Sequence, residues 1–515
     1  GRTGRSAASV GAGILTSRLT GFLRDIVIAA TFGAGSVMDA YTAALRIPNI
    51  LRNLLGEGTL SASFVPVYSA ALGRGDHEEA RETASGVLGI VLAVSTLVVA
   101  LGIGLAPWLA RLLTPGFDAE LSSLTASLIR ILFPMSGLMI AGAWCLGVLT
   151  SHRRFFLPFA APVAWNLAQI AGLLIAVRVG WEPLIMVLAW ATLAGAVLQV
   201  LVQLPSSARL AGTLVPRLRR PPEPVRRVVR NAGPVAAGQG IFQVSSLADV
   251  MLASTLVSVG AAGALSGMYY AQRIVQLPMA VFGVAVAVAA LPEMSRDGAL
   301  EALRPHLASG VRQILYFILP AVVILLVYGD LVIAVIYQRG AFDAEDARLV
   351  RWLLSAYAAG LVATSLVKLF ASGFHALQDT RTPMRYAAVS VAIAIGLGAA
   401  LMFAFAGAGL GQRAATGLAI GGAVGAWLNL ILLSRGLGRR GLIGVWRAGA
   451  RPIARLALGA ALAGGVSWPV RLWTDGRLGA GTFGAIAELL AVLGAGGIAY
   501  IAVAGTGPLR RIVRS

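Results

Sequence analysis

Charged side chains lie inside stretches of this sequence that are otherwise apolar. An Arg or Asp at the centre of a membrane helix costs on the order of 3 kcal/mol on insertion scales, so such residues usually pair with one another or face a water-filled cavity. Arg18 and Asp25 are seven residues apart and share a helix face, as do Asp39 and Arg46. The charged residues of the first two apolar stretches are Arg18, Arg24, Asp25, Asp39, Arg46, Arg52 and Glu57.

Basic residues dominate this buried charge. The second half of the chain adds Arg273 and Lys368, which is the only lysine in the sequence. A guanidinium presents a planar fork of N–H donors that matches the oxygens of a phosphate. The pattern therefore predicts a water-filled cavity in which Arg24, Arg52 and Arg273 bind a phosphate-bearing substrate. Ion pairs between helices are the alternative, and they are as good an explanation for the other cations, Arg18, Arg46 and Lys368.

The acidic residues admit two interpretations. Asp25, Asp39 and Glu57 either orient a neighbouring arginine or contact the ligand directly. Asp249, in the polar stretch QVSSLADV, could bind a cation, although a buried hydrogen-bonded aspartate is the simpler interpretation. The four histidines lack the spacing of metal ligands, and the sequence has no P-loop for ATP. We therefore expect no cofactor.

Long apolar stretches must position these charges. Of the 515 residues, 57% are hydrophobic and 12% are charged, against roughly 25% charged in an ordinary soluble domain. The stretches are long enough to cross a bilayer about 30 Å thick, and they lack the alternation of a membrane barrel. We predict an all-α polytopic membrane protein with 14 transmembrane helices. These lie near residues 8–32, 37–70 (kinked at Pro48 and Pro66), 83–112, 124–150, 156–178, 184–204, 233–258, 265–294, 310–337, 347–376, 384–406, 413–434, 452–470 and 483–505.

The formal net charge of +20 reflects arginines that gather in short loops between the apolar stretches. With 14 spans, these loops alternate so that 26 of their arginines lie on the side of the two termini and 4 lie on the opposite side. Since cytoplasmic loops are rich in Lys and Arg, we predict that both termini are cytoplasmic. The same distribution favours anionic membrane lipids, and not nucleic acid, as the partner of the basic residues.

An internal repeat organises the helices into two lobes. GAGSVMDAYTAALRI from Gly33 aligns without gaps with GAAGALSGMYYAQRI from Gly260, at an offset of 227 residues. An offset of six helices preserves the chain direction, so these are parallel repeats, a plan found in transporters. The predicted division is a first lobe of six helices at 1–205, a basic cytoplasmic linker at 206–232, a second lobe of six helices at 233–436, and two added helices at 437–515.

Residues 16–66, TSRLTGFLRDIVIAATFGAGSVMDAYTAALRIPNILRNLLGEGTLSASFVP, resemble the opening signature of the MurJ (MviN) lipid II flippases. Three later stretches agree in order with the same family: YYAQRIVQLPMAVFGVAVAVAALP, YQRGAFDAEDARL and FHALQDTRTPMR. The resemblance implies membership of the multidrug/oligosaccharidyl-lipid/polysaccharide exporter superfamily. Its members have two six-helix lobes, and in this family two terminal helices form a groove for a lipid tail.

The resemblance implies a transporter and not an enzyme. Its activity would be export of lipid II, the undecaprenyl-pyrophosphate-linked peptidoglycan precursor, to the outer leaflet of a bacterial inner membrane by alternating access. This export serves cell wall biogenesis and cell shape. Coupling to a monovalent cation or to the membrane potential, and contact with the cell-wall synthesis machinery, are further expectations. The family places Arg24, Arg52 and Arg273 at the pyrophosphate, and other cavity positions match Arg18, Ser17, Asp25, Asp39, Glu57 and Ser266.

Rival functions differ in their chemistry. A drug or cation antiporter of the same superfamily would favour an acidic and aromatic cavity, whereas this sequence carries an excess of arginine. A flippase for another polyprenyl-linked glycan shares the physics and differs only in contacts to the headgroup. A membrane glycosyltransferase is the rival from a different class, and turnover of a labelled donor would reveal it.

Overall fold

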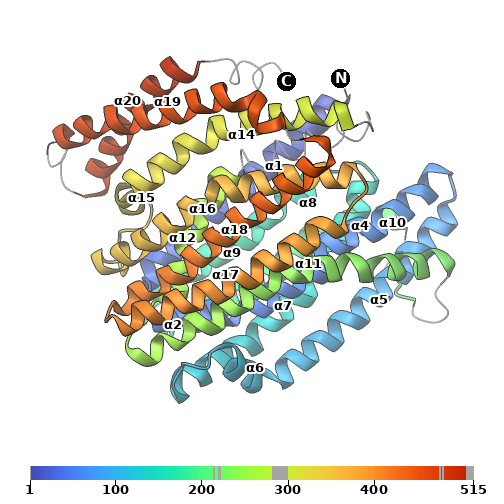
Figure 1. Ribbon diagram of the computed structural model, residues 1–515. Helices are drawn as coiled ribbons and strands as arrows, with labels where there is room; N and C mark the ends of the chain where they lie inside the picture. Colours follow the sequence, from blue (N-terminus) through green and yellow to red (C-terminus); the bar gives the residue numbers. More distant parts are fainter. Residues whose placement is uncertain are drawn as a thin grey trace. The chain divides into compact units, whose positions relative to one another are not determined.

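The computed structural model describes residues 2–212, 215–217, 222–280, 300–442, 444–474, 477 and 481–505. In these ranges every regular element is a helix (Figure 1). Ten helices of the described part are long and apolar enough to cross a membrane, and a shorter apolar helix covers Gln243–Val259. This confirms the all-α polytopic membrane class. Each predicted span coincides with one helix or a run of helices, except that residues 281–294 of the eighth span lie outside the described residues.

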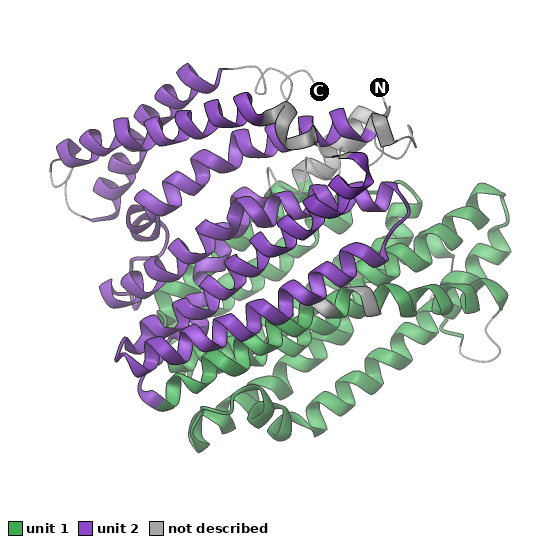
Figure 2. Cartoon of the chain, viewed as in Figure 1, with its two compact units in different colours: residues 1–258 green, residues 259–515 purple. Residues whose placement is uncertain are grey.

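The chain folds as two compact units, residues 1–258 and 259–515 (Figure 2). The division falls one helix later than the linker at 206–232, because α11 (Glu223–Thr255) packs against α4 (Gly58–Gly73) and α5 (His77–Gly104) of the first unit. The functional division of the chain into four parts stays a prediction.

The first unit is built around α7 (Ala119–Ser151), whose apolar window is 72% buried. Its Trp144 is fully buried, and the indole N–H donates to the Ala84 carbonyl of α5 at 3.0 Å. The other helices of this unit are α1 (Arg2–Phe32), α2 (Ser36–Ala44), α3 (Arg46–Leu51), a π-helical turn (Arg52–Glu57), α6 (Ala106–Leu113), α8 (Phe156–Ala160), α9 (Pro162–Val179) and α10 (Leu184–Ala211).

The predicted second span is interrupted twice, first one helical turn before Pro48 and again before α4. α2 ends at Ala44 and α3 begins at Arg46, and a π-helical turn follows α3, in which Gly56 has the non-helical angles φ −95° and ψ −114°. Pro48, the third residue of α3, has no N–H to bond to the carbonyl of Ala44 four residues earlier, and α2 ends at that residue. Pro66 lies inside α4 without ending it. The break between α2 and α3 agrees with the kink predicted at Pro48, whereas a kink at Pro66 stays a prediction.

The second unit repeats the plan, with α16 (Ala344–Ala376) packed against α12, α14 and α18. The internal repeat survives in the backbone, since Gly33 before α2 and Gly260 before α12 both have positive φ, at +61° and +79°. The remaining helices are α12 (Ala264–Pro278), α14 (Leu300–Val327), α15 (Gly329–Ile336), α17 (Arg381–Gly407), α18 (Thr416–Leu437), α19 (Gly444–Thr474) and α20 (Thr482–Ala504).

Glycines allow the closest helix pair of this unit. Gly417, Gly421 and Gly425 lie four residues apart on the face of α18 that packs against α17. A Cβ at Gly421 would meet the Ala394 carbonyl oxygen and the Gly398 Cα at 2.5 Å each, and neither backbone atom can rotate away. Small residues at such contacts let membrane helices gain dispersion energy without hydrophobic drive from water.

Two adjacent glycines test this packing. Gly421→Ala should destabilise the protein by about 1–3 kcal/mol, because the added methyl overpacks a backbone contact. Gly422→Ala should be neutral or stabilising, since nothing lies within 4 Å of its Cβ and alanine favours a helix by up to about 1 kcal/mol. Unfolding in detergent measures both, and equal stability of the two variants would contradict the close contact.

Candidate functional site

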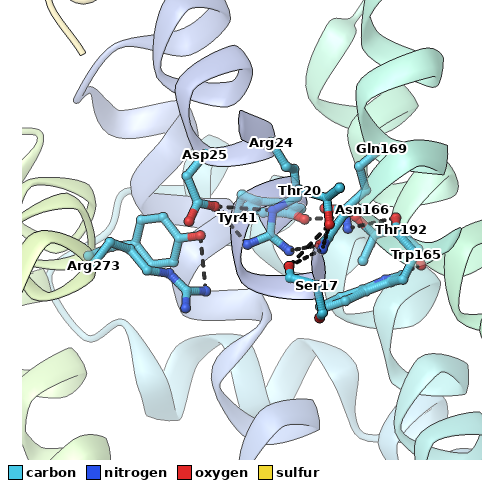
Figure 3. A network of polar contacts seen from close by, with 11 residues as sticks. Ser17, Thr20, Arg24, Asp25, Tyr41, Trp165, Asn166, Gln169, Thr192 and Arg273 are labelled. Atoms are coloured by element: carbon cyan, nitrogen blue, oxygen red, sulfur yellow. Dashed lines mark hydrogen bonds and ion pairs between the residues drawn. The ribbon is translucent and has the colours of Figure 1, made fainter. Parts of the chain in front are cut away.

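Two adjacent residues of α1 form a buried pair of opposite charges in the first unit. Arg24 and Asp25 are only 5% and 3% exposed. The guanidinium donates from Nε and Nη2 to Oδ1 of Asp25, at 3.1 and 2.7 Å (Figure 3). The pair is neutral as a whole, which lowers the cost of burying each charge.

An asparagine of α9 holds the other side of the guanidinium. Asn166 accepts from Arg24 Nη1 through Oδ1 at 3.0 Å. Its Nδ2 donates back to α1, to the Ser17 carbonyl at 3.1 Å and to Thr20 Oγ1 at 3.0 Å (Figure 3). The amide of Asn166 therefore joins the two helices. Its oxygen holds the guanidinium of Arg24, and its nitrogen bonds to Ser17 and Thr20 of α1.

Aromatic side chains extend this cluster to two more helices. The guanidinium carbon of Arg24 lies 5.3 Å from the ring centroid of Trp165, a distance suited to a cation–π contact. The Trp165 indole donates to the Thr192 carbonyl of α10 at 2.9 Å, and the Thr192 hydroxyl lies 2.8 Å from the Tyr41 hydroxyl of α2. We call Arg24, Asp25, Asn166 and Trp165 the arginine cluster; four helices determine its geometry.

The seven-residue spacing of Arg18 and Asp25 predicted a shared face, but the structure pairs Asp25 with Arg24 instead. Arg18 is exposed, and its side chain makes no hydrogen bond or ion pair with any described residue. Ser17 contributes its carbonyl to the cluster. Sequence reasoning missed Asn166 and Trp165, whose only signal was polar character in an otherwise apolar helix.

The remaining candidates of the first unit lie on α2, on α3, on the π-helical turn after α3 and on α11. Asp39 is fully buried in α2. Arg46 donates from Nε to the Ser246 carbonyl of α11 at 3.0 Å and interacts electrostatically with Asp249. No group of three or more His, Cys, Asp or Glu among the described residues could hold a metal ion, so a cation at Asp249 stays a prediction.

The segment between α3 and α4 carries two further candidates. Arg52 is half-buried at the start of the π-helical turn. The side chain of Glu57 lies outside the described residues, so its predicted role is untested.

The candidates of the second unit lie on α12 and α16. Arg273 donates from Nη2 to the Tyr269 hydroxyl at 3.3 Å, and its guanidinium carbon lies 4.8 Å from that ring centroid (Figure 3). Ser266, the repeat counterpart of Asp39, is fully buried, with Oγ 3.3 Å from the Gly263 carbonyl. Lys368 is exposed on α16. Both units thus hold an arginine beside an aromatic ring.

The second unit also contains an apolar groove of about 240 Å³ between α14, α19 and α20. Tyrosine hydroxyls tie its walls together: Tyr500 donates to the Tyr316 carbonyl at 2.6 Å, Tyr316 to the Gly505 carbonyl at 2.8 Å, and Tyr328 lies 2.8 Å from Ser467 Oγ. With their polar ends bonded, these side chains present apolar faces to the groove. It involves both helices that fall outside the internal repeat.

Solved structures of two membrane proteins share the fold of this chain. The chain is similar to the inward closed conformation of the lipid II flippase MurJ, with a TM-score of 0.76 and 22% identity over 98% of this chain and 99% of the other. It is also similar to an inward-facing multidrug resistance MATE family transporter of the MOP superfamily, with a TM-score of 0.65 and 17% identity over 84% and 96% of the chains. The chain therefore shares the helical fold of these two proteins.

Sequence comparison identifies the particular family. The family model of lipid II flippase MurJ matches residues 28–487. A probable lipid II flippase MurJ of Rhizobium tropici is 34% identical over 391 residues, 74% of this chain and 72% of the relative. The lipid II flippase MurJ of Burkholderia cenocepacia is 33% identical over 396 residues, 74% and 75% of the chains. This chain belongs to the MurJ family, a bacterial family of transporters and not of enzymes.

Proposed function

We propose that this chain translocates lipid II from the cytoplasmic to the outer leaflet of a bacterial inner membrane by alternating access. Membership of the MurJ family over residues 28–487 supports the substrate. The observation that carries the mechanism is the buried guanidinium of Arg24, held between Asp25 and Asn166. The pyrophosphate of the substrate is an anion, and a guanidinium can bind its oxygens through bidentate hydrogen bonds.

The arginine cluster supports binding by exchange of anions. Asp25 neutralises Arg24 while no substrate is bound. This pairing avoids the free-energy cost of an unpaired buried charge. The pyrophosphate then competes with the Asp25 carboxylate for the same guanidinium. Asn166 and Trp165 hold the arginine in place during the exchange, so little side-chain entropy is lost on binding.

The second unit supplies a guanidinium of similar design. Tyr269 orients Arg273 by a hydrogen bond and a ring contact, and we assign Arg273 to the same pyrophosphate. The other residues proposed to contact or orient the substrate are Arg52, Arg18, Ser17, Asp39, Glu57, Ser266 and Lys368.

We assign the polyprenyl tail to the apolar groove of α14, α19 and α20. Because hydrocarbon tails of the bilayer are as apolar as the groove, burial from lipid yields little free energy. The groove therefore orients the tail and leaves most of the affinity to the headgroup.

We also propose that both termini lie in the cytoplasm, on the same side of the membrane as the basic loops. The cell-wall synthesis machinery is the expected protein partner.

Replacement of Arg24 or of Arg273 should strongly slow transport. In vesicles with purified protein, Arg24→Ala and Arg273→Ala should each slow lipid II flipping at least tenfold, because a charge-assisted hydrogen bond is worth about 1.5–3 kcal/mol. The matched control is Arg178→Ala, which removes an exposed arginine from α9.

Two outcomes of this assay would contradict the proposal. Full activity of Arg24→Ala would remove the assigned role of the cluster. Equal transport of a polyprenyl lipid with an unrelated glycan would move the assignment to a broader flippase, and transport of a cationic drug alone would favour the antiporter.

The membrane potential should drive this transport. Moving two negative charges out of a negative interior is worth roughly 5 kcal/mol per 100 mV. Collapse of an imposed potential in the same vesicles should therefore slow flipping severalfold. An unchanged rate would contradict electrical coupling, and dependence on a sodium gradient that is lost in Asp249→Asn would assign the coupling to a monovalent cation instead.

A further inference from the structure

A second basic site lies in the first unit, apart from the arginine cluster. A cavity of about 570 Å³ opens where α7 ends, α8 begins and α10 enters its last turns. We call it the basic pocket. Its polar lining is Arg153, Arg154, Arg209 and Ser206, and its apolar lining is Leu149, Phe155, Phe156, Leu157 and Leu210.

The three arginines of the basic pocket keep their positive charge uncompensated. All three are exposed, and none makes a side-chain hydrogen bond or ion pair with a described residue. No acidic residue lines the pocket. Other arginines at this end of the unit differ, because Arg74, Arg81 and Arg217 are each paired with a glutamate: Glu79, Glu78 and Glu82, respectively.

The backbone turn at Arg153 does not require an arginine side chain. Arg153 has φ +58°, a left-handed conformation in which glycine is the natural residue at a helix end. Its N–H bonds to the Thr150 carbonyl at 2.9 Å, and the Arg154 N–H bonds to the Leu149 carbonyl at 2.8 Å, both through the backbone alone. An arginine at this position costs backbone strain that a glycine would avoid. This cost indicates that the guanidinium group has a function of its own.

The position of the pocket points to a lipid. The candidate span of α7 ends at Ser151, and that of α10 ends at Ala211, so the pocket lies at the level where the membrane-spanning segments end. Its phenylalanines and leucines suit the upper part of an acyl chain, and its guanidinium groups suit a phosphate. Basic pockets between transmembrane helices bind anionic headgroups in this way.

We propose that the basic pocket binds the phosphate group of an anionic phospholipid from the surrounding bilayer. This site is independent of the proposed transport of lipid II. Its ligand chemistry is a phosphodiester next to apolar chains, held by the forks of Arg153, Arg154 and Arg209.

Binding of a labelled phosphatidylglycerol to the full-length protein in detergent tests the proposal. The triple variant Arg153→Ala, Arg154→Ala, Arg209→Ala should bind it at least tenfold more weakly than the unmodified protein. The matched control is Arg226→Ala, Arg227→Ala, Arg230→Ala, which removes three exposed arginines from α11 at the same end of the unit and should bind as the unmodified protein does. Equal affinity of the pocket variant and the unmodified protein would overturn the proposal.

Arg153→Gly separates binding from folding. Glycine fits the left-handed turn, so this variant should keep its melting temperature while its affinity for phosphatidylglycerol falls severalfold. Unchanged affinity would overturn the role of this residue.

Two competitors identify the source of the phosphate. Unlabelled phosphatidylglycerol should displace the label, whereas phosphatidylcholine and inorganic pyrophosphate should require far higher concentrations. Displacement by pyrophosphate at concentrations equal to those of phosphatidylglycerol would overturn a lipid in favour of a soluble anion.

Discussion

The contact between the guanidinium of Arg24 and the carboxylate of Asp25 is the interaction on which the first unit depends. An isolated guanidinium in hydrocarbon is costly, and a carboxylate without a partner is costly as well. Placed side by side on α1 at 2.7 Å, the two groups form a neutral pair that a membrane protein can bury. Asn166 and Trp165 then complete the surroundings of the arginine from α9. The helices around α1 are thus arranged to hold a charge that a bilayer would otherwise reject.

The rest of the fold reflects the packing of helices in a lipid bilayer, where the hydrophobic effect does not drive helices together. Close approach must come from small residues, as between α17 and α18, or from side-chain hydrogen bonds such as that from Trp144 to the Ala84 carbonyl. The groove of α14, α19 and α20 follows the same rule, since its tyrosines bond their hydroxyl groups to backbone or to Ser467. The hydroxyl groups of these tyrosines are hydrogen-bonded within the protein, and the apolar parts of their side chains line the groove.

The sequence alone predicted the membrane spans because hydropathy needs no tertiary contact. It also located Arg24, Asp25 and Arg273, since a charge in an apolar stretch is visible in one dimension. The partners of these charges were not predictable in the same way. Asn166 lies 142 residues from Arg24, and no periodicity connects them.

Local geometry was also hidden from sequence reasoning. Pro48 predicted the break between α2 and α3, but no proline predicted the non-helical backbone at Gly56. The basic pocket escaped notice because its arginines belong to loops and helix ends, where the charge bias of membrane topology already accounted for them.

The lipid II affinity of Asp25→Asn, measured together with its free energy of unfolding, tests anion exchange most directly. If the carboxylate competes with pyrophosphate for Arg24, asparagine should tighten binding of labelled lipid II several fold. It should also lower the stability of the empty protein by about 3 kcal/mol, because a buried guanidinium loses its counter-charge. Weaker binding with unchanged stability would show that Asp25 is not the resting partner of Arg24, and would contradict the account.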